Sequence, residues 1–161
     1  MHTITDKEEY YVHHVQCIDS LNRAWVILQE LNVIERSASI ADAAFRCALI
    51  EYAKPYTRSD GIHKHGKNGY ELPEPSLSLE DLVLHRQILT LRHKVLAHTD
   101  LTLKEAKVYV GSYKGRVSVV VSTNVLSPFP EIRAVIDMIE RTLDNMYLER
   151  TRLEQALALT V

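Results

Sequence analysis

Histidine and arginine side chains gather in one segment of this chain, residues 84–100. Three of the eight histidines lie there beside an arginine: His85, Arg92, His93 and His98. An imidazole titrates near neutral pH, and a guanidinium can bind an anion through paired donors. On a helix, Asp81, His85 and Arg92 would form a narrow polar line with leucine-rich strips on both sides. Such a line needs partners, so it is either a buried structural network or a site between helices or between subunits.

A second group of polar residues lies in residues 54–70, which are locally basic and rich in tyrosine. Its cations are Lys54, Arg58, Lys64 and Lys67, against Asp60 alone, and its aromatic neighbours are Tyr52, Tyr56 and Tyr70. Basic and aromatic side chains together suit single-stranded nucleic acid, because phosphates meet cations and bases stack on rings. The other interpretation is a solvated loop whose tyrosines pack onto the helices.

Two short patterns in the same loop do not complete a site. Residues 61–68 nearly match the phosphate-binding loop G-x-x-x-x-G-K-[ST], but Asn68 replaces the hydroxyl that ligates Mg²⁺, and the segment follows a helix. His63 and His65 could chelate a metal as a pair, but no further ligand set accompanies them. Cys17 and Cys47 lack metal-ligand spacing and are expected to be small core residues in a reducing compartment. We therefore predict no metal site and no cofactor.

The elements that would position these residues are mainly helical. Thr5 and Glu8 fit a capping box, and apolar residues then recur every three or four positions to about residue 35. A second helix, capped by Ser37 or Ser39, should end before Pro55, which lacks an amide hydrogen and disfavours helical dihedrals in its predecessor. Its expected apolar face is Ile40, Ala43, Ala44, Cys47 and Ala48. Residues 55–77 then form a long loop, which in a small domain is often functional or mobile.

The second half of the chain predicts two more helices and a hairpin. Ser78 should open a helix that continues to about Ala97. Alternating valines around the turn Gly111–Gly115 predict a β-hairpin at about 106–122, and a long helix follows Pro130. We expect residues 1–161 to form one domain. Its fold class is mainly α, an up-and-down four-helix bundle with a β-hairpin inserted before the last long helix.

The composition is that of an ordinary soluble globular protein. Of 161 residues, 46% are hydrophobic and 25% charged, while five glycines and five prolines are too few for a disordered or collagen-like chain. A net charge of -2 excludes a polycationic nucleic-acid binder but leaves a small, local site open. The charged N-terminus is unlike a signal peptide, and no stretch approaches the length of a membrane span. A cytoplasmic protein without membrane contact is expected.

The arginine–histidine segment resembles a known signature. Residues 91–100, Leu-Arg-His-Lys-Val-Leu-Ala-His-Thr-Asp, look like the R-x(4–6)-H motif of the HEPN superfamily (higher eukaryotes and prokaryotes nucleotide-binding), especially its abortive-infection members. A polar residue commonly follows the arginine in that family, and His93 fits. Residues 52–61 are similar to the segment that joins two bundle helices in those relatives. The resemblance covers residues 45–100 in motif detail and the whole chain in helical layout.

The resemblance implies a metal-independent endoribonuclease of a phage-defence or toxin–antitoxin system. It would act on RNA as a homodimer whose two sites face each other, with an antitoxin protein as a further partner. Arg92 would hold the scissile phosphate, His98 would transfer a proton, and His93 would be a second acid or base or orient the phosphate. The supporting groups would be Asp81, His85 and Asp100, and the RNA-binding residues would be Arg58, Lys64, Lys67 and Tyr56.

Two other functions stay open. A non-catalytic HEPN-like module that binds a nucleotide or a protein partner could keep the same residues, and in an unrelated bundle Arg92 and His85 would only satisfy buried polar groups. A ribonuclease requires Arg92 and His98 to converge on one accessible cleft. An ideal helix separates them by about 120° around its axis. The helix must therefore end or bend near Ala97, or a second subunit must bring the groups together.

Overall fold

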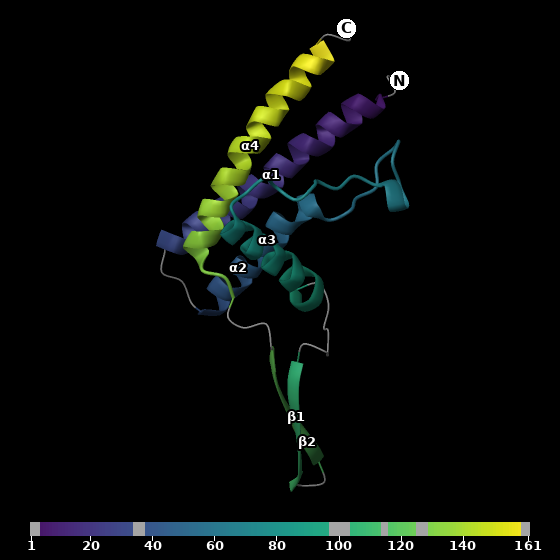
Figure 1. Ribbon diagram of the computed structural model, residues 1–161. Helices are drawn as coiled ribbons and strands as arrows, with labels where there is room; N and C mark the ends of the chain where they lie inside the picture. The colour runs from purple at the N-terminus through teal and green to yellow at the C-terminus, as the bar shows by residue number, and fades with distance from the viewer. Residues whose placement is uncertain (1–3, 34–37, 97–103, 114–115, 125–128, 159–161) are drawn as a thin grey trace.

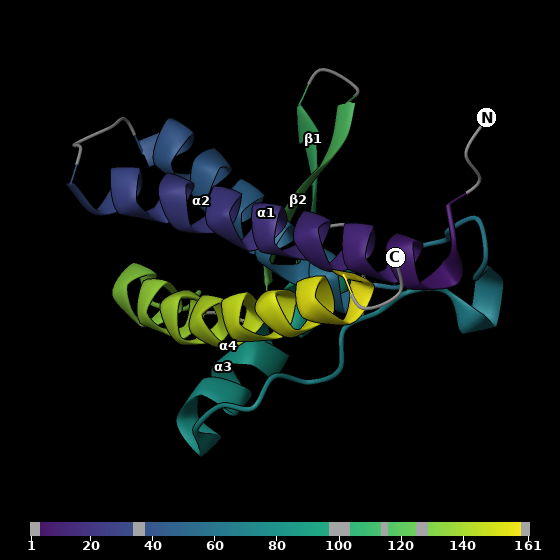
Figure 2. The ribbon, with the colours of Figure 1, turned by 90° about the horizontal axis from the view of Figure 1, so that it is seen from above.

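The computed structural model describes residues 4–33, 38–96, 104–113, 116–124 and 129–158. In these ranges the chain forms four α-helices: α1 (Asp6–Val33), α2 (Ala38–Ala53), α3 (Leu79–Leu91) and α4 (Ile132–Ala158). Helices α1 and α4 lie side by side and antiparallel, so the first turn of α1 and the last turn of α4 lie at the same end of the pair (Figures 1 and 2). Helix α2 packs against α1, and α3 crosses obliquely near the lower end of α4. The prediction of a mainly helical fold is confirmed.

The helix boundaries follow local signals in the sequence. The backbone N–H of Thr5 donates to Glu8 Oε2 at 2.7 Å, and the N–H of Glu8 donates to Thr5 Oγ1 at 3.3 Å, which is a capping box. At the start of α3, the N–H of Asp81 donates to Ser78 Oγ at 3.2 Å. Helix α2 ends at Ala53, and Pro55 lies in the following 3₁₀ turn η1 (Lys54–Tyr56). These three predicted boundaries are confirmed.

The long segment after η1 is tied to α1 through a buried carboxylate. Glu9 accepts hydrogen bonds from the backbone N–H groups of Ile62 and His63, the second at 2.9 Å, and from the Tyr70 hydroxyl at 2.9 Å. Only 8% of Glu9 is exposed. A Cβ atom on Gly61 would lie 2.6 Å from the Tyr70 ring and 2.7 Å from Glu9 Oε1. Glycine at position 61 is therefore what lets the loop approach α1 so closely.

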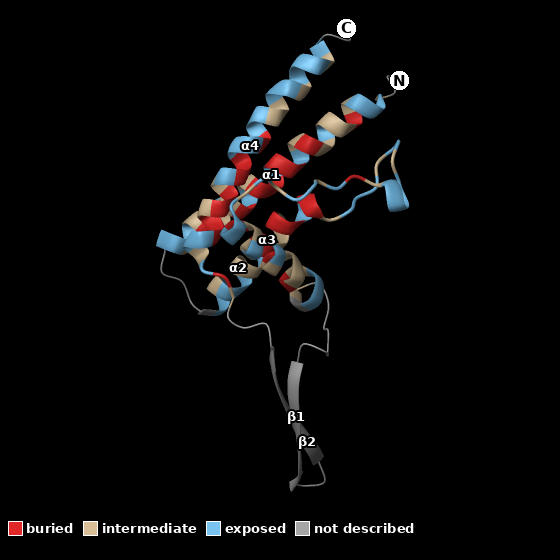
Figure 3. Cartoon of the chain, in the orientation of Figure 1, coloured by how far each residue is buried: buried red, intermediate tan, exposed pale blue. Residues whose placement is uncertain are grey.

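All four helices contribute to one apolar core (Figure 3). Its largest fully buried side chains include Leu21, Leu28, Leu49, Tyr52, Ile88, Leu91, Ile136, Met138 and Ile139. Cys17 belongs to this core, as expected, but Cys47 is exposed. The expected apolar face of α2 is also wrong in part, because Ile40 is 56% exposed and the helix packs inward through Ala48, Leu49 and Tyr52. Large side chains near the end of α2 therefore decide which of its faces is buried.

Two strands lie between α3 and α4 in the sequence. Strand β1 (Lys104–Tyr113) pairs antiparallel with β2 (Arg116–Asn124), with Val108 opposite Val120. The register is irregular between Tyr109 and Ser112. In Figure 1 the pair extends away from the helices. Within the described ranges, no helix has the length and apolar character that crossing a membrane would need.

Candidate functional site

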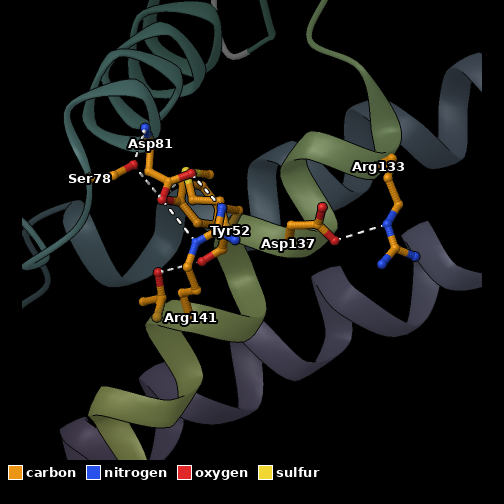
Figure 4. Close-up of polar contacts among 8 residues, drawn as sticks. Tyr52, Ser78, Asp81, Arg133, Asp137 and Arg141 are labelled. Atoms are coloured by element: carbon orange, nitrogen blue, oxygen red, sulfur yellow. Dashed lines mark hydrogen bonds and ion pairs between the residues drawn. The ribbon is translucent and has the colours of Figure 1, made fainter.

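The polar line predicted on α3 begins with an ion pair to α4. Arg141 donates from Nη2 to Asp81 Oδ1 at 2.6 Å and from Nε to Oδ2 at 2.9 Å (Figure 4). Ser78 Oγ donates to the same carboxylate at 2.9 Å. The hydrogen bonds from Arg141, with a smaller contribution from Ser78, hold the pKa of Asp81 below its usual range although burial opposes this. Asp81 therefore links α3 to α4, and its oxygens are occupied by protein partners.

The next member of the line, His85, is bonded to α2. Its Nδ1 lies 2.8 Å from the hydroxyl of Tyr52, and its ring packs edge-on against Tyr56 with centroids 4.6 Å apart. The side chain is 2% exposed, and burial lowers its pKa, which favours the neutral imidazole. Of the two alternatives for the polar line, the buried structural network describes Asp81 and His85. The side-chain hydrogen bonds described for Asp81 and His85 lead to Ser78, Arg141 and Tyr52.

Arg92 lies where the α-helix ends. Helix α3 stops at Leu91, and Arg92–Leu96 form a π-helical segment, η3. The expected change in the helix thus begins at Arg92, earlier than Ala97. Single π turns are rare and often occur at functional sites. Arg92 is half-buried, and its Nη1 lies 3.2 Å from Nδ1 of the exposed His93. His98 and Asp100 lie outside the described residues.

Arg92 lines a cleft of about 310 Å³ between α1, the start of the long loop and η3. We call it the Arg92 cleft. Its lining residues are His13, Gln16, Cys17, Ser20, Lys54, Pro55, Thr57, Arg58, Ser59 and Arg92. Three of these carry a positive charge, and none of the described lining residues is acidic. Carboxylates outside the lining balance part of this charge, because Lys54 pairs with Glu51 and Arg58 Nη2 lies 3.5 Å from Glu71.

The cleft also holds a histidine that the sequence patterns did not single out. His13 is half-buried, and its ring stacks on Tyr70 with centroids 5.1 Å apart. Its Nε2 lies 3.6 Å from Cys17 Sγ. Burial, and then the charge of His14, lowers the pKa of His13, so its imidazole is neutral and able to accept a proton at pH 7. Burial raises the pKa of the Cys17 thiol to about 12, so this thiol stays protonated.

The predicted RNA-binding residues fall into different places. Arg58 lines the cleft beside Arg92. Lys64 instead lies over the Tyr70 ring, 4.9 Å from its centroid and 3.9 Å from Asp6, and the exposed Lys67 lies in the 3₁₀ turn η2 (Gly66–Asn68). The assignment of Tyr56 to RNA stacking is wrong, because this side chain is 6% exposed and packs against His85. The tyrosines of this segment pack onto the helices, as the second interpretation held.

Among the described residues there is no group of three or more histidine, cysteine, aspartate or glutamate side chains that could hold a metal ion. His63 Nε2 instead lies 2.7 Å from the carbonyl oxygen of Ile4. Comparison of the chain with models of protein families, with curated proteins and with solved structures finds no match.

Proposed function

We propose that the protein is a metal-independent endoribonuclease that holds an RNA phosphodiester in the Arg92 cleft. The observation that carries the proposal is that Arg92 and Arg58, which the sequence singled out for separate reasons, line one cleft together with Lys54 and His13. A guanidinium can donate two parallel hydrogen bonds to phosphate oxygens. Three cations in a cleft without lining carboxylates suit an anion of the charge and size of a phosphate group.

The chemistry proposed is attack of the ribose 2′-oxygen on the adjacent phosphorus. A bond forms between phosphorus and the 2′-oxygen, the bond to the 5′-oxygen breaks, and a 2′,3′-cyclic phosphate results. One imidazole removes the 2′-hydroxyl proton and another group protonates the departing 5′-oxygen. Arg92 would stabilise the charge that develops on the phosphate oxygens. The HEPN resemblance suggests His98 and His93 for the proton transfers, and the cleft geometry adds His13 as a candidate base.

The biological setting proposed rests on the motif alone. It comprises a phage-defence or toxin role, a homodimer with facing sites, an antitoxin partner and a cytoplasmic location. The finer architecture proposed is the up-and-down four-helix bundle with a β-hairpin inserted before the last long helix, as the sequence patterns predict. The order of the described helices and strands along the chain supports it.

The test is cleavage of single-stranded RNA in EDTA by the parent protein and by three variants. The parent should release a 2′,3′-cyclic phosphate. We expect Arg92→Ala to slow cleavage by about 10²-fold or more and His98→Ala by about 10²- to 10⁴-fold. Arg133→Ala is the matched control, because Arg133 pairs with Asp137 at 2.9 Å on α4 (Figure 4) and does not line the cleft. Equal activity in all four proteins would assign the cleavage to a contaminant.

The second candidate is a non-catalytic module that binds RNA or a nucleotide in the same cleft. One observation favours this second candidate. The His13 side chain stacks on Tyr70 and contacts Cys17, and these contacts restrict the movement of the imidazole toward a bound phosphate. Binding of RNA by the parent without cleavage, weakened by Arg92→Ala and unchanged by Arg133→Ala, would support this function over the nuclease.

A further inference from the structure

The described lining of the Arg92 cleft divides into two parts that differ in charge. All three cations come from residues 54–59 and from Arg92. Helix α1 supplies four residues that are uncharged at pH 7: His13, Gln16, Cys17 and Ser20. Their spacing places them on one face of the helix, which we call the α1 side of the cleft. A phosphate group would therefore bind to the cations, and the uncharged part of the same ligand would face the α1 side.

The cleft has room for more than a phosphate group. Its volume of about 310 Å³ equals that of roughly ten water molecules at about 30 Å³ each. A bound phosphate group, with its five heavy atoms, would leave about half of this space open. The open space is large enough for part of the nucleoside that carries the phosphate, and the α1 side supplies the side chains that this nucleoside would meet.

Three hydroxyls of the described lining are already hydrogen-bonded within the protein. Ser20 Oγ accepts a hydrogen bond from Arg23 Nη2 at 3.0 Å. Thr57 Oγ1 donates to a backbone carbonyl at 2.9 Å, and Ser59 Oγ donates to another at 3.4 Å. These hydroxyls are held by their protein partners, so a different side chain is needed to read the uncharged part of a ligand.

Gln16 is the side chain that meets this need. It is exposed, and its amide has no hydrogen-bond partner among the described residues. On α1 it lies about one turn after His13, the candidate base of the proposed reaction. A primary amide carries a carbonyl acceptor next to an N–H donor. It can therefore form two hydrogen bonds with any base edge on which a donor and an acceptor are neighbours.

We propose that Gln16 contacts the nucleobase next to the phosphate held in the Arg92 cleft and selects adenine. The paired contact that a glutamine amide makes with a base is to N6 and N7 of adenine. The Watson–Crick edge of adenine also has an acceptor, N1, beside the N6 amino group, so either edge of an unpaired adenine fits the amide. The inference rests on the proposed function only for RNA binding in the cleft, which both candidate functions share.

The experiment is an NMR titration of the full chain with three 2′-O-methyl ribotrinucleotides, whose bases are all adenine, all purine or all uracil. The methyl group blocks the 2′-oxygen, so the probes cannot be cleaved. Purine has the ring of adenine without the N6 amino group. The adenine probe should shift the side-chain amide signals of Gln16. It should bind roughly 2- to 10-fold more tightly than the purine probe, the difference that one neutral hydrogen bond makes, and more tightly than the uracil probe.

Three variants separate the base contact from phosphate binding. Gln16→Ala should bind the adenine and purine probes equally, and it should fold, because alanine favours helix and position 16 is exposed. Arg92→Ala should weaken binding of all three probes and keep the preference for adenine. Gln29→Ala is the matched control, because Gln29 lies on the same helix, donates to Glu140 at 3.5 Å and does not line the cleft. It should bind the probes as the parent does.

Three results would overturn the inference. A preference for adenine that persists in Gln16→Ala would remove the role of Gln16 and leave RNA binding in place. Binding of the purine or uracil probe by the parent as tightly as the adenine probe would have the same consequence, and this result needs no variant. Absence of binding by every probe at millimolar concentration would overturn the proposed function as well, because the cleft would then not hold RNA.

Discussion

Two neighbouring buried tyrosines provide a direct test of the hydrogen-bond arrangement around α2. Tyr52 and Tyr56 pack against each other with ring centroids 5.6 Å apart. The Tyr52 hydroxyl is bonded to His85 Nδ1, whereas the Tyr56 hydroxyl has no partner among the described residues. Replacing each tyrosine with phenylalanine removes the same atom from almost the same environment. Tyr52→Phe should nevertheless lower the free energy of unfolding, whereas Tyr56→Phe should leave it unchanged or raise it.

The magnitudes follow from what each substitution leaves behind. Tyr52→Phe leaves His85 Nδ1 buried without its partner, which should lower the free energy of unfolding by about 1–3 kcal/mol. Tyr56→Phe removes a buried hydroxyl that lacks a partner, so the free energy of unfolding should be unchanged or higher by up to about 1 kcal/mol. With a urea m-value of about 2 kcal/mol/M, Tyr52→Phe moves the unfolding midpoint down by roughly 0.5–1.5 M.

Urea unfolding followed by far-UV circular dichroism, without added ligand, measures both variants against the parent. Equal m-values would show that the shift in midpoint reports stability rather than a change in the unfolded state. A loss in Tyr56→Phe as large as in Tyr52→Phe would refute the reasoning. The Tyr56 hydroxyl would then have a strong partner inside the protein.

Three other predictions concern the ion pair, the loop and the cleft. Asp81→Asn should lower the free energy of unfolding at pH 7 by about 1–2 kcal/mol. Because the folded-state pKa of Asp81 is lowered, the stability that Asp81 contributes is complete above the ordinary carboxyl pKa and is lost as pH falls through the folded value. A stability difference between parent and variant in urea unfolding that is as large at pH 2 as at pH 7 would contradict this prediction. The His63 N–H donates to the Glu9 carboxylate, so Glu9→Gln should speed amide exchange at His63 without affecting α3. Unchanged exchange at His63 would argue against Glu9 as the residue that holds the loop to α1. In filter binding, the logarithm of the RNA association constant should fall with the logarithm of the salt concentration at a slope of about −2 for three phosphate contacts. The magnitude of the slope should be smaller by about 0.7 in Arg92→Ala and unchanged in Arg133→Ala. A slope near zero would exclude the cleft as a phosphate site.

Local chemistry explains the parts of this fold that could be predicted from the sequence. The cap at Thr5, the cap at Ser78 and the end of α2 before Pro55 each depend on residues within four positions of one another. Each of these boundaries can therefore be predicted without knowing how the rest of the chain packs. The sequence also predicts that Asp81 and His85 need hydrogen-bond partners. It does not show that these partners are Arg141 and Tyr52.

Packing between distant segments explains what could not be predicted. Tyr56 lies in a basic segment, and composition alone made it a candidate for stacking on a base, but η1 turns its ring into the core against His85. His13 shows the converse. It becomes a cleft residue only because the segment around Lys54 and Arg58 folds back along α1. No periodicity within α1 contains that information.

The π-helical segment at Arg92 explains why a helical wheel wrongly groups the polar residues of residues 79–96 on one line. The wheel puts Asp81, His85 and Arg92 on one line because it assumes the same turn throughout. In the structure Asp81 and His85 lie on α-helical turns and are bonded to α4 and α2, whereas Arg92 begins a π-helical segment and lines a cleft against α1. A π turn is wider than an α turn, so the angles of an ideal helical wheel do not apply within Arg92–Leu96. The irregular turn starts at Arg92 and not within the part of α3 that packs on the core. Because such turns often occur at functional sites, this position favours a functional role for Arg92 over a purely structural one.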